Sequence, residues 1–147
     1  MKTIGRIDKV DFPELELENI AIKVDTGAYT TSIHCHHVKE IEKDGIKHLE
    51  FKLLDHTYPQ YQKKIMRVDE YKRKVVRSSF GNAEDRFIIK TNILIFGKKY
   101  RINLSLSQRG EMRYPILLGR KFLNKKFIVD TSQRNLSFQL KAEKKNK

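Results

Sequence analysis

Hydrophobic and polar residues alternate along most of the chain. Residues 20–24 place isoleucine and valine at every second position, and residues 49–53 repeat the pattern with Leu49, Phe51 and Leu53. Alternation with a period of two is typical of β-strands that bury one face. The pattern therefore predicts a mostly β chain.

Turn signals separate the predicted strands. The pair Asp44–Gly45 lies between alternating flanks and predicts a tight hairpin, because both residues tolerate positive φ. Residues 55–64 have no clean period and are expected to form a surface loop. Further strands are expected over residues 71–80, 86–96 and 100–106, joined by turns at 81–85 and 97–99.

The carboxyl-terminal third carries the first helical signal. A short helix is expected over Arg120–Lys126, followed by a strand at 127–129 and a polar turn at 130–135. The alternation of Leu136, Phe138 and Leu140 then predicts a last strand. No repeat or linker interrupts the pattern, so we expect one closed all-β domain over residues 1–140 with a charged tail at 141–147.

Length and composition narrow the class of protein. The chain has 147 residues, of which 39% are hydrophobic, and this is too apolar for a disordered basic tail. The single cysteine, Cys35, makes no internal disulfide, and the first residues lack the apolar core of a secretory signal. Purely apolar runs of about four residues are far short of the ~20 needed to span a bilayer. We therefore expect a cytoplasmic protein without membrane attachment.

The positive charge is concentrated in one part of the sequence. The formal net charge is +13, with −3 over residues 1–50 and +16 over residues 51–147. Clusters at 63–67 and 72–77, with tyrosines nearby, are candidates for phosphate or base contacts. Any single cluster is more often a solvated face, but the sum leaves nucleic acid, the ribosome or an acidic peptide as possible partners.

Two ordered elements carry the candidate chemistry. Asp25-Thr26-Gly27-Ala28 follows a hydrophobic strand, and Pro115–Arg120 later supplies two leucines and a glycine before the predicted helix. This combination resembles the retropepsin-like aspartic peptidases. The block around 105–123 is most similar to the bacterial and archaeal family once labelled ATP-dependent zinc proteases. The resemblance implies a closed acid-protease barrel.

Aspartic peptidase chemistry requires two carboxylates about 3 Å apart that share one proton, so that one acts as a base on water and the other as an acid. The chain has one such turn, so the resemblance implies a C2 homodimer that pairs Asp25 with its symmetry mate. Asp130 is the alternative partner within the chain. We discount Asp130 because no second leucine-glycine element follows it and residues 131–135 are typical of a turn.

The resemblance also implies roles for other residues. Thr26 is expected to hydrogen-bond across the dimer axis, Gly27 to bring backbone N–H groups to the carboxylate, and Gly119 to pack behind the catalytic loop. Tyr29 stands where retroviral enzymes have an acidic partner for Arg120, and the hairpin near Gly81 is the nearest candidate for a flap. The expected site comprises Asp25 with Thr26, Gly27, Ala28, Leu118 and Gly119, and Arg109, Arg113 and Arg120 as candidate substrate-binding residues.

The sequence gives less support to metal-dependent or cofactor-dependent chemistry. His34-Cys35-His36-His37 invites a metal interpretation, but alternate residues of a strand face opposite ways, so at most two ligands converge. No phosphate-binding loop is present, and we expect neither metal nor cofactor. Members of the resembled family are associated with a ligase that adds glutamates to a ribosomal protein, which makes an acidic tail a candidate substrate. A non-catalytic basic binding module, associated with the ribosome or nucleic acid, is the alternative.

Overall fold

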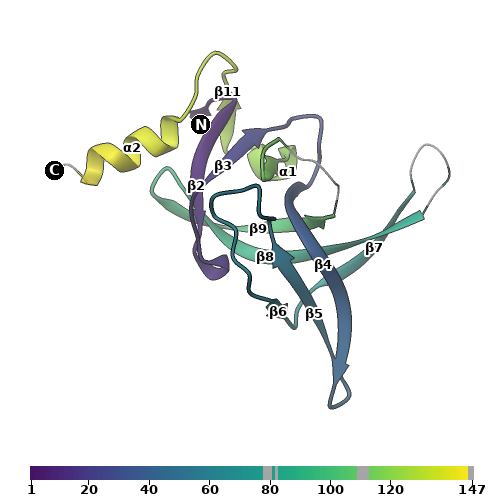
Figure 1. The fold of residues 1–147 in the computed structure, drawn as a ribbon. Helices are drawn as coiled ribbons and strands as arrows, with labels where there is room; N and C mark the ends of the chain where they lie inside the picture. The colour runs from purple at the N-terminus through teal and green to yellow at the C-terminus, as the bar shows by residue number, and fades with distance from the viewer. Residues whose placement is uncertain (78–80, 82, 109–112, 146–147) are drawn as a thin grey trace.

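Six strands close into a barrel in the computed structural model, which describes residues 1–77, 81, 83–108 and 113–145. Each strand pairs with the next around the ring, and the last pairs with the first (Figure 1). The ring consists of β10 (Ile116–Leu118), β3 (Leu17–Val24), β2 (Ile7–Phe12), β8 (Ala83–Ile95), β9 (Lys98–Ser107) and β4 (Thr31–Lys43). The predicted fold class is confirmed.

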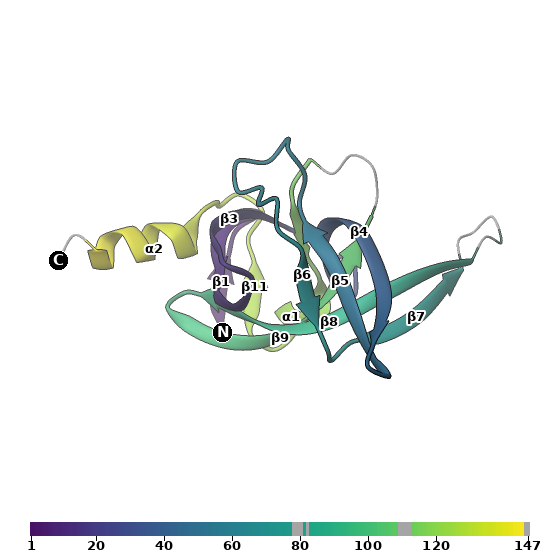
Figure 2. The same ribbon diagram turned by 60° about the horizontal axis from the view of Figure 1, so that its bottom comes forward.

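Further strands extend this barrel. β5 (Ile46–Leu53) pairs with β4, β6 (Met66–Val68) pairs with β5, and β7 (Lys72–Arg77) pairs with β8. A separate two-stranded parallel sheet joins β1 (Lys2–Ile4) to β11 (Phe127–Val129). The helical segments are a 3-10 turn at Pro13–Leu15, α1 (Arg120–Leu123) and α2 (Leu136–Lys145). Figures 1 and 2 show α2 and the β7–β8 hairpin projecting from opposite ends of the barrel.

The alternating positions form the core. Ile20, Ile22, Leu49 and Phe51 are fully buried, together with Leu104 from β9. The Asp44–Gly45 turn has positive φ at both residues, 54° and 79°, as the hairpin prediction requires. Residues 54–65 contain no regular helix or strand. Sequence alternation therefore predicted both the strands and their buried faces.

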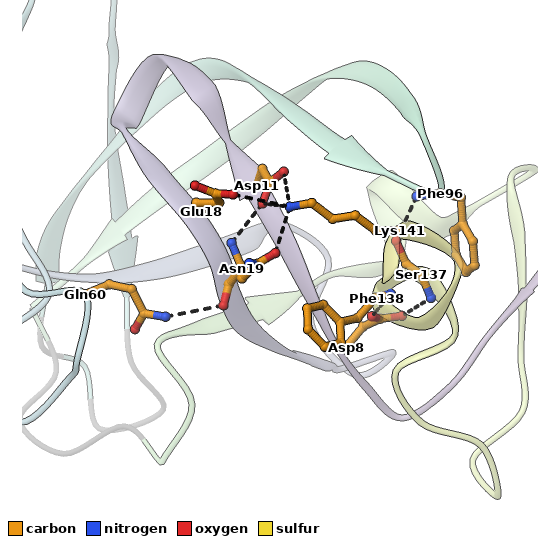
Figure 3. A network of polar contacts seen from close by, with 9 residues as sticks. All are labelled: Asp8, Asp11, Glu18, Asn19, Gln60, Phe96, Ser137, Phe138 and Lys141. Carbon is orange, nitrogen blue, oxygen red and sulfur yellow. Dashed lines mark hydrogen bonds and ion pairs between the residues drawn. The ribbon is translucent and has the colours of Figure 1, made fainter. Parts of the chain in front are cut away.

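The prediction of a last strand through Leu136, Phe138 and Leu140 is wrong, because these residues lie in α2. The buried Asp8 on β2 accepts hydrogen bonds from the N–H groups of Ser137 (2.9 Å) and Phe138 (3.0 Å) at the helix start (Figure 3). These bonds satisfy N–H groups that a helix leaves unpaired at its first turn. Burial raises the pKa of Asp8 above its ordinary value, against the opposing effect of these bonds.

A second contact fixes the middle of α2. Lys141 Nζ donates to both oxygens of Asp11 (3.0 and 2.8 Å) and to Asn19 Oδ1 (2.7 Å) (Figure 3). Residues 141–145, expected to form a charged tail, therefore continue the helix. No helix in the described parts of the chain is long and apolar enough to cross a membrane.

Candidate active site

Asp25 directly follows β3 at the edge of the barrel. β10 lies between β3, to which it is parallel, and β4, to which it is antiparallel. The N–H of Asp25 donates to the carbonyl of Leu118, the last residue of β10, at 2.9 Å. The two sequence elements that suggested the site, 93 residues apart, are thus joined by a backbone hydrogen bond.

A tight turn orients the Asp25 carboxylate. The N–H of Gly27 donates to Asp25 Oδ1 at 3.1 Å, and the N–H of Ala28 donates to the Asp25 carbonyl at 3.2 Å. Asp25 is half-buried and Thr26 is exposed. The turn therefore holds the carboxylate where part of it is accessible to solvent.

Gly119 packs against the backbone of the loop after this turn. A Cβ at position 119 would lie 2.6 Å from the Tyr29 carbonyl oxygen and 2.7 Å from Thr30 C, so only glycine fits without movement. The N–H of Gly119 donates to the buried Thr31 Oγ1 at 3.0 Å. Sequence reasoning anticipated the close packing of Gly119 but missed Thr31, whose signal was its place directly after the motif.

Arg120 contacts the loop after Asp25 and has no acidic partner among the residues that the structure describes. Its guanidinium donates to the carbonyls of Thr26 (3.3 Å) and Gly27 (3.2 Å) and lies 5.4 Å from the centre of the Tyr29 ring. Its backbone N–H donates to the Ala28 carbonyl at 2.9 Å. Tyr29 stands where retroviral enzymes have an acidic residue, and its aromatic ring contacts the Arg120 guanidinium through a cation–π interaction.

A cavity of about 440 Å³ opens beside Asp25. The catalytic loop lines it on one side, and Lys74, Arg86 and Ile88 from the β7–β8 hairpin line it on another. Ser32, Ser105 and Ser107 add hydroxyl groups, and Leu117 completes the lining. The stem of the expected flap hairpin thus contributes to the cavity, whereas residues 78–80 and 82 near its tip lie outside the described residues.

Lys74 and Arg86 are directly opposite each other on β7 and β8. Like charges in this position destabilise a strand pair, and Lys74 has no carboxylate partner within the described residues. The neighbouring Arg73 instead pairs with Glu40 (3.3 Å) and Asp85 (2.6 Å). The hydrogen bond from Arg73 holds the pKa of Asp85 below its ordinary value. Arg86 pairs with Glu84 at 4.0 Å, so Lys74 is the cavity cation that lacks a carboxylate partner in the described part of the chain.

Arg113 and Asp130 are not among the described residues that line the cavity with Asp25. Arg109 lies outside the described residues. Arg113 is exposed. Asp130 is half-buried, and its Oδ1 accepts hydrogen bonds from the N–H (3.0 Å) and hydroxyl (2.6 Å) of Ser132. These bonds lower the pKa of Asp130 and are those of a turn, as the sequence indicated.

The histidine segment binds protein groups. His34 Nε2 hydrogen-bonds Asp55 Oδ2 at 2.7 Å, and His36 Nδ1 lies 2.6 Å from the Leu54 carbonyl oxygen. Burial raises the pKa of the Cys35 thiol above its ordinary range. Within the described ranges, no three histidine, cysteine, aspartate or glutamate side chains come together as a metal site. His34 is buried.

The barrel, the Asp-Thr-Gly turn and the glycine packed behind it are the features that the resemblance to retropepsin-like peptidases predicts. The family model of the RimB-like proteins, described as retropepsin-like aspartic endopeptidase RimB, matches residues 3–139. The chain belongs to this family.

Similar proteins agree on the fold and differ in length. A probable alpha-L-glutamate ligase of Desulfotalea psychrophila is 32% identical over 88% of this chain, and one of Shewanella pealeana is 33% identical over 88%. The chain spans 28% of the length of each of these relatives. A crystal structure of a Legionella pneumophila protein of unknown function (DUF785) superposes with a TM-score of 0.69 at 24% identity, covering 92% of this chain and 98% of that one.

Proposed function

We propose that the protein is a homodimeric aspartic endopeptidase whose catalytic dyad is the Asp25 carboxylate of each subunit. The observation that supports the proposal is a single Asp-Thr-Gly turn, held by Gly119 and Arg120 at the subunit surface. One carboxylate cannot act as acid and base at the same moment, whereas two that share a proton can. A C2 interface brings identical residues together at the axis.

In this mechanism one Asp25 carboxylate removes a proton from water as the water oxygen attacks the scissile carbonyl carbon. The other Asp25 carboxyl donates its proton to the carbonyl oxygen, which gives a tetrahedral diol. The first Asp25 then gives the proton taken from water to the amide nitrogen, and the C–N bond breaks as a hydroxyl of the diol returns its proton to the second Asp25, which restores the shared proton. The loop bonds from Gly27 and Arg120 fix the carboxylate orientation on which these transfers depend.

The substrate proposed for this site is a peptide with acidic side chains. Lys74 and Arg86 line the cavity beside Asp25, and a carboxylate placed between them would relieve their mutual repulsion. The names of the relatives also refer to glutamate chemistry. A glutamate-rich tail on a protein is the candidate that combines both observations.

The test compares Asp25→Asn with Asp130→Asn on a peptide that carries an oligoglutamate tail. Asparagine at position 25 removes the shared proton without changing side-chain volume, so cleavage should fall by at least about a thousandfold while the fold is unchanged. Asp130→Asn should cleave at the wild-type rate. Full activity of Asp25→Asn, measured by mass spectrometry of the products, would refute the mechanism.

A binding module without catalysis is the second candidate, favoured by the net charge of +13. It predicts salt-dependent binding of polyanions that survives Asp25→Asn, with no cleavage of the glutamate-tailed peptide at any pH. Titration of a fluorescent oligonucleotide at two salt concentrations, beside the cleavage assay, distinguishes the two functions.

A further inference from the structure

A second cavity, of about 290 Å³, lies next to the catalytic loop. It shares Thr30 with the cavity beside Asp25, but its other lining residues are different. Four cationic side chains line it: Lys90 from β8, Arg101 from β9, Lys121 from α1 and Lys126 from the turn after α1. Four separate segments therefore bring positive charge to one small cavity.

The strand register explains part of this convergence. Lys90 is directly opposite Asn103 on β9, and Arg101 is opposite Asn92 on β8, so all four side chains project from the same face of this strand pair. Asn103 also lines the cavity, and the buried Phe122 contributes an apolar wall. An anion in this cavity would meet charged donors beside surfaces that exclude water.

The charge of the cavity is poorly balanced by the protein. No carboxylate is among its lining residues. Arg101 pairs with Glu14 at 2.8 Å, and Lys126 Nζ donates to the Phe122 carbonyl at 3.3 Å. In the described ranges, Lys90 and Lys121 have no carboxylate partner. Other cations, such as Arg67 with Glu50 (2.7 Å), are neutralised within the fold.

The compactness of this cluster indicates the class of ligand. Side chains on one face of an extended peptide are about 7 Å apart, so a cavity of this size would accept about one carboxylate and leave most of its cations unmatched. A phosphoryl group carries about −1.5 to −2 charges on clustered oxygens. We propose that this cavity is a binding site for a compact phosphate anion of the diphosphate class, separate from the catalytic cavity and independent of the proposed peptidase activity.

The test measures binding of inorganic pyrophosphate by isothermal titration calorimetry at 150 mM NaCl, with Lys90→Gln/Lys121→Gln as the site variant. Removing two unpaired charge-assisted donors should weaken binding by on the order of a hundredfold. The control Lys98→Gln/Lys99→Gln removes the same formal charge from the first two residues of β9 and should bind as the wild type does. Circular dichroism checks that both variants fold.

Two competitors separate the sources of the anion. Inorganic phosphate should compete with pyrophosphate weakly, and a triglutamate peptide should not compete at the same concentration. Equal loss of binding in the control variant would overturn the proposal, because the effect would then reflect net charge alone. Binding of a single-stranded oligoribonucleotide with no binding of pyrophosphate would also overturn it, as would effective competition by triglutamate. Asp25→Asn should bind pyrophosphate normally, so this result stands apart from the outcome of the cleavage assay.

Discussion

Two junctions in this molecule join distant segments of the chain through a glycine. At the catalytic junction, Gly119 packs against the backbone of Tyr29 and Thr30. At the carboxyl-terminal junction, a Cβ on Gly5 would overlap the carbonyl of Gln133, and the N–H of Arg6 donates to that carbonyl at 3.0 Å. Both junctions thus depend on close backbone contact, but they differ in what holds the remaining residues.

Backbone groups hold most of the catalytic junction, because the N–H groups of Asp25 and Arg120 find carbonyl partners in the facing segment. Backbone N–H groups of Arg6, Asp130 and Asn135 also cross the carboxyl-terminal junction, but α2 itself is held by side chains, through Asp8 at its start and Lys141 in its middle. A short motif can specify backbone contacts, whereas side-chain contacts depend on separate residues far away in the sequence. The contacts of the catalytic junction can therefore be predicted from the sequence, whereas the side-chain contacts of α2 cannot.

Replacing each glycine by alanine, in two separate variants, is the test of this comparison with the largest expected effect on stability. Gly119→Ala and Gly5→Ala each force a Cβ into a backbone group and should each lower the free energy of unfolding by about 1–3 kcal/mol or more. Only Gly119→Ala should also reduce cleavage per folded molecule, because it displaces the catalytic loop. Urea unfolding and the cleavage assay measure the two effects, and equal loss of cleavage in both variants would remove the distinction.

Asp8→Ala isolates the side-chain junction. Loss of the two N–H acceptors at the start of α2 should lower the free energy of unfolding by about 2 kcal/mol. Cleavage at saturating protein concentration should stay within about twofold of wild type, because Asp8 contacts none of the catalytic loop. Chemical denaturation followed by circular dichroism gives the first quantity. A collapse of cleavage in a well-folded Asp8→Ala protein would show that the junctions are coupled.

Arg120→Gln tests the side chain that contacts the Thr26 and Gly27 carbonyls at the catalytic junction. Glutamine cannot bridge the Thr26 and Gly27 carbonyls while covering the Tyr29 ring, so cleavage should fall about tenfold with little change in unfolding. Tyr29→Phe retains the aromatic face and should keep nearly full activity. Wild-type cleavage by Arg120→Gln, measured at saturating substrate, would mean that backbone bonds alone fix the loop.

These differences explain how far the sequence predicts the structure. The Asp44–Gly45 turn and the alternation in β3 and β5 follow from local patterns, whereas the packing of the Leu118–Gly119 element against the loop after Asp25 is expected from the resemblance to retropepsin-like peptidases. The alternation of Leu136, Phe138 and Leu140 suits a strand, but the helix is selected by Asp8, a residue 129 positions before Ser137. Lys74 and Arg86 became site candidates only when strand register placed them opposite each other beside Asp25.

The central claim is that two chains supply one active site, and subunit mixing tests it most directly. Wild-type and Asp25→Asn chains are mixed at equal concentrations, allowed to exchange, and assayed for cleavage of the glutamate-tailed peptide. If both aspartates are needed, only wild-type pairs are active, and about one quarter of the activity of the undiluted wild type remains. Retention of about one half would mean that each chain acts alone, and would contradict the account.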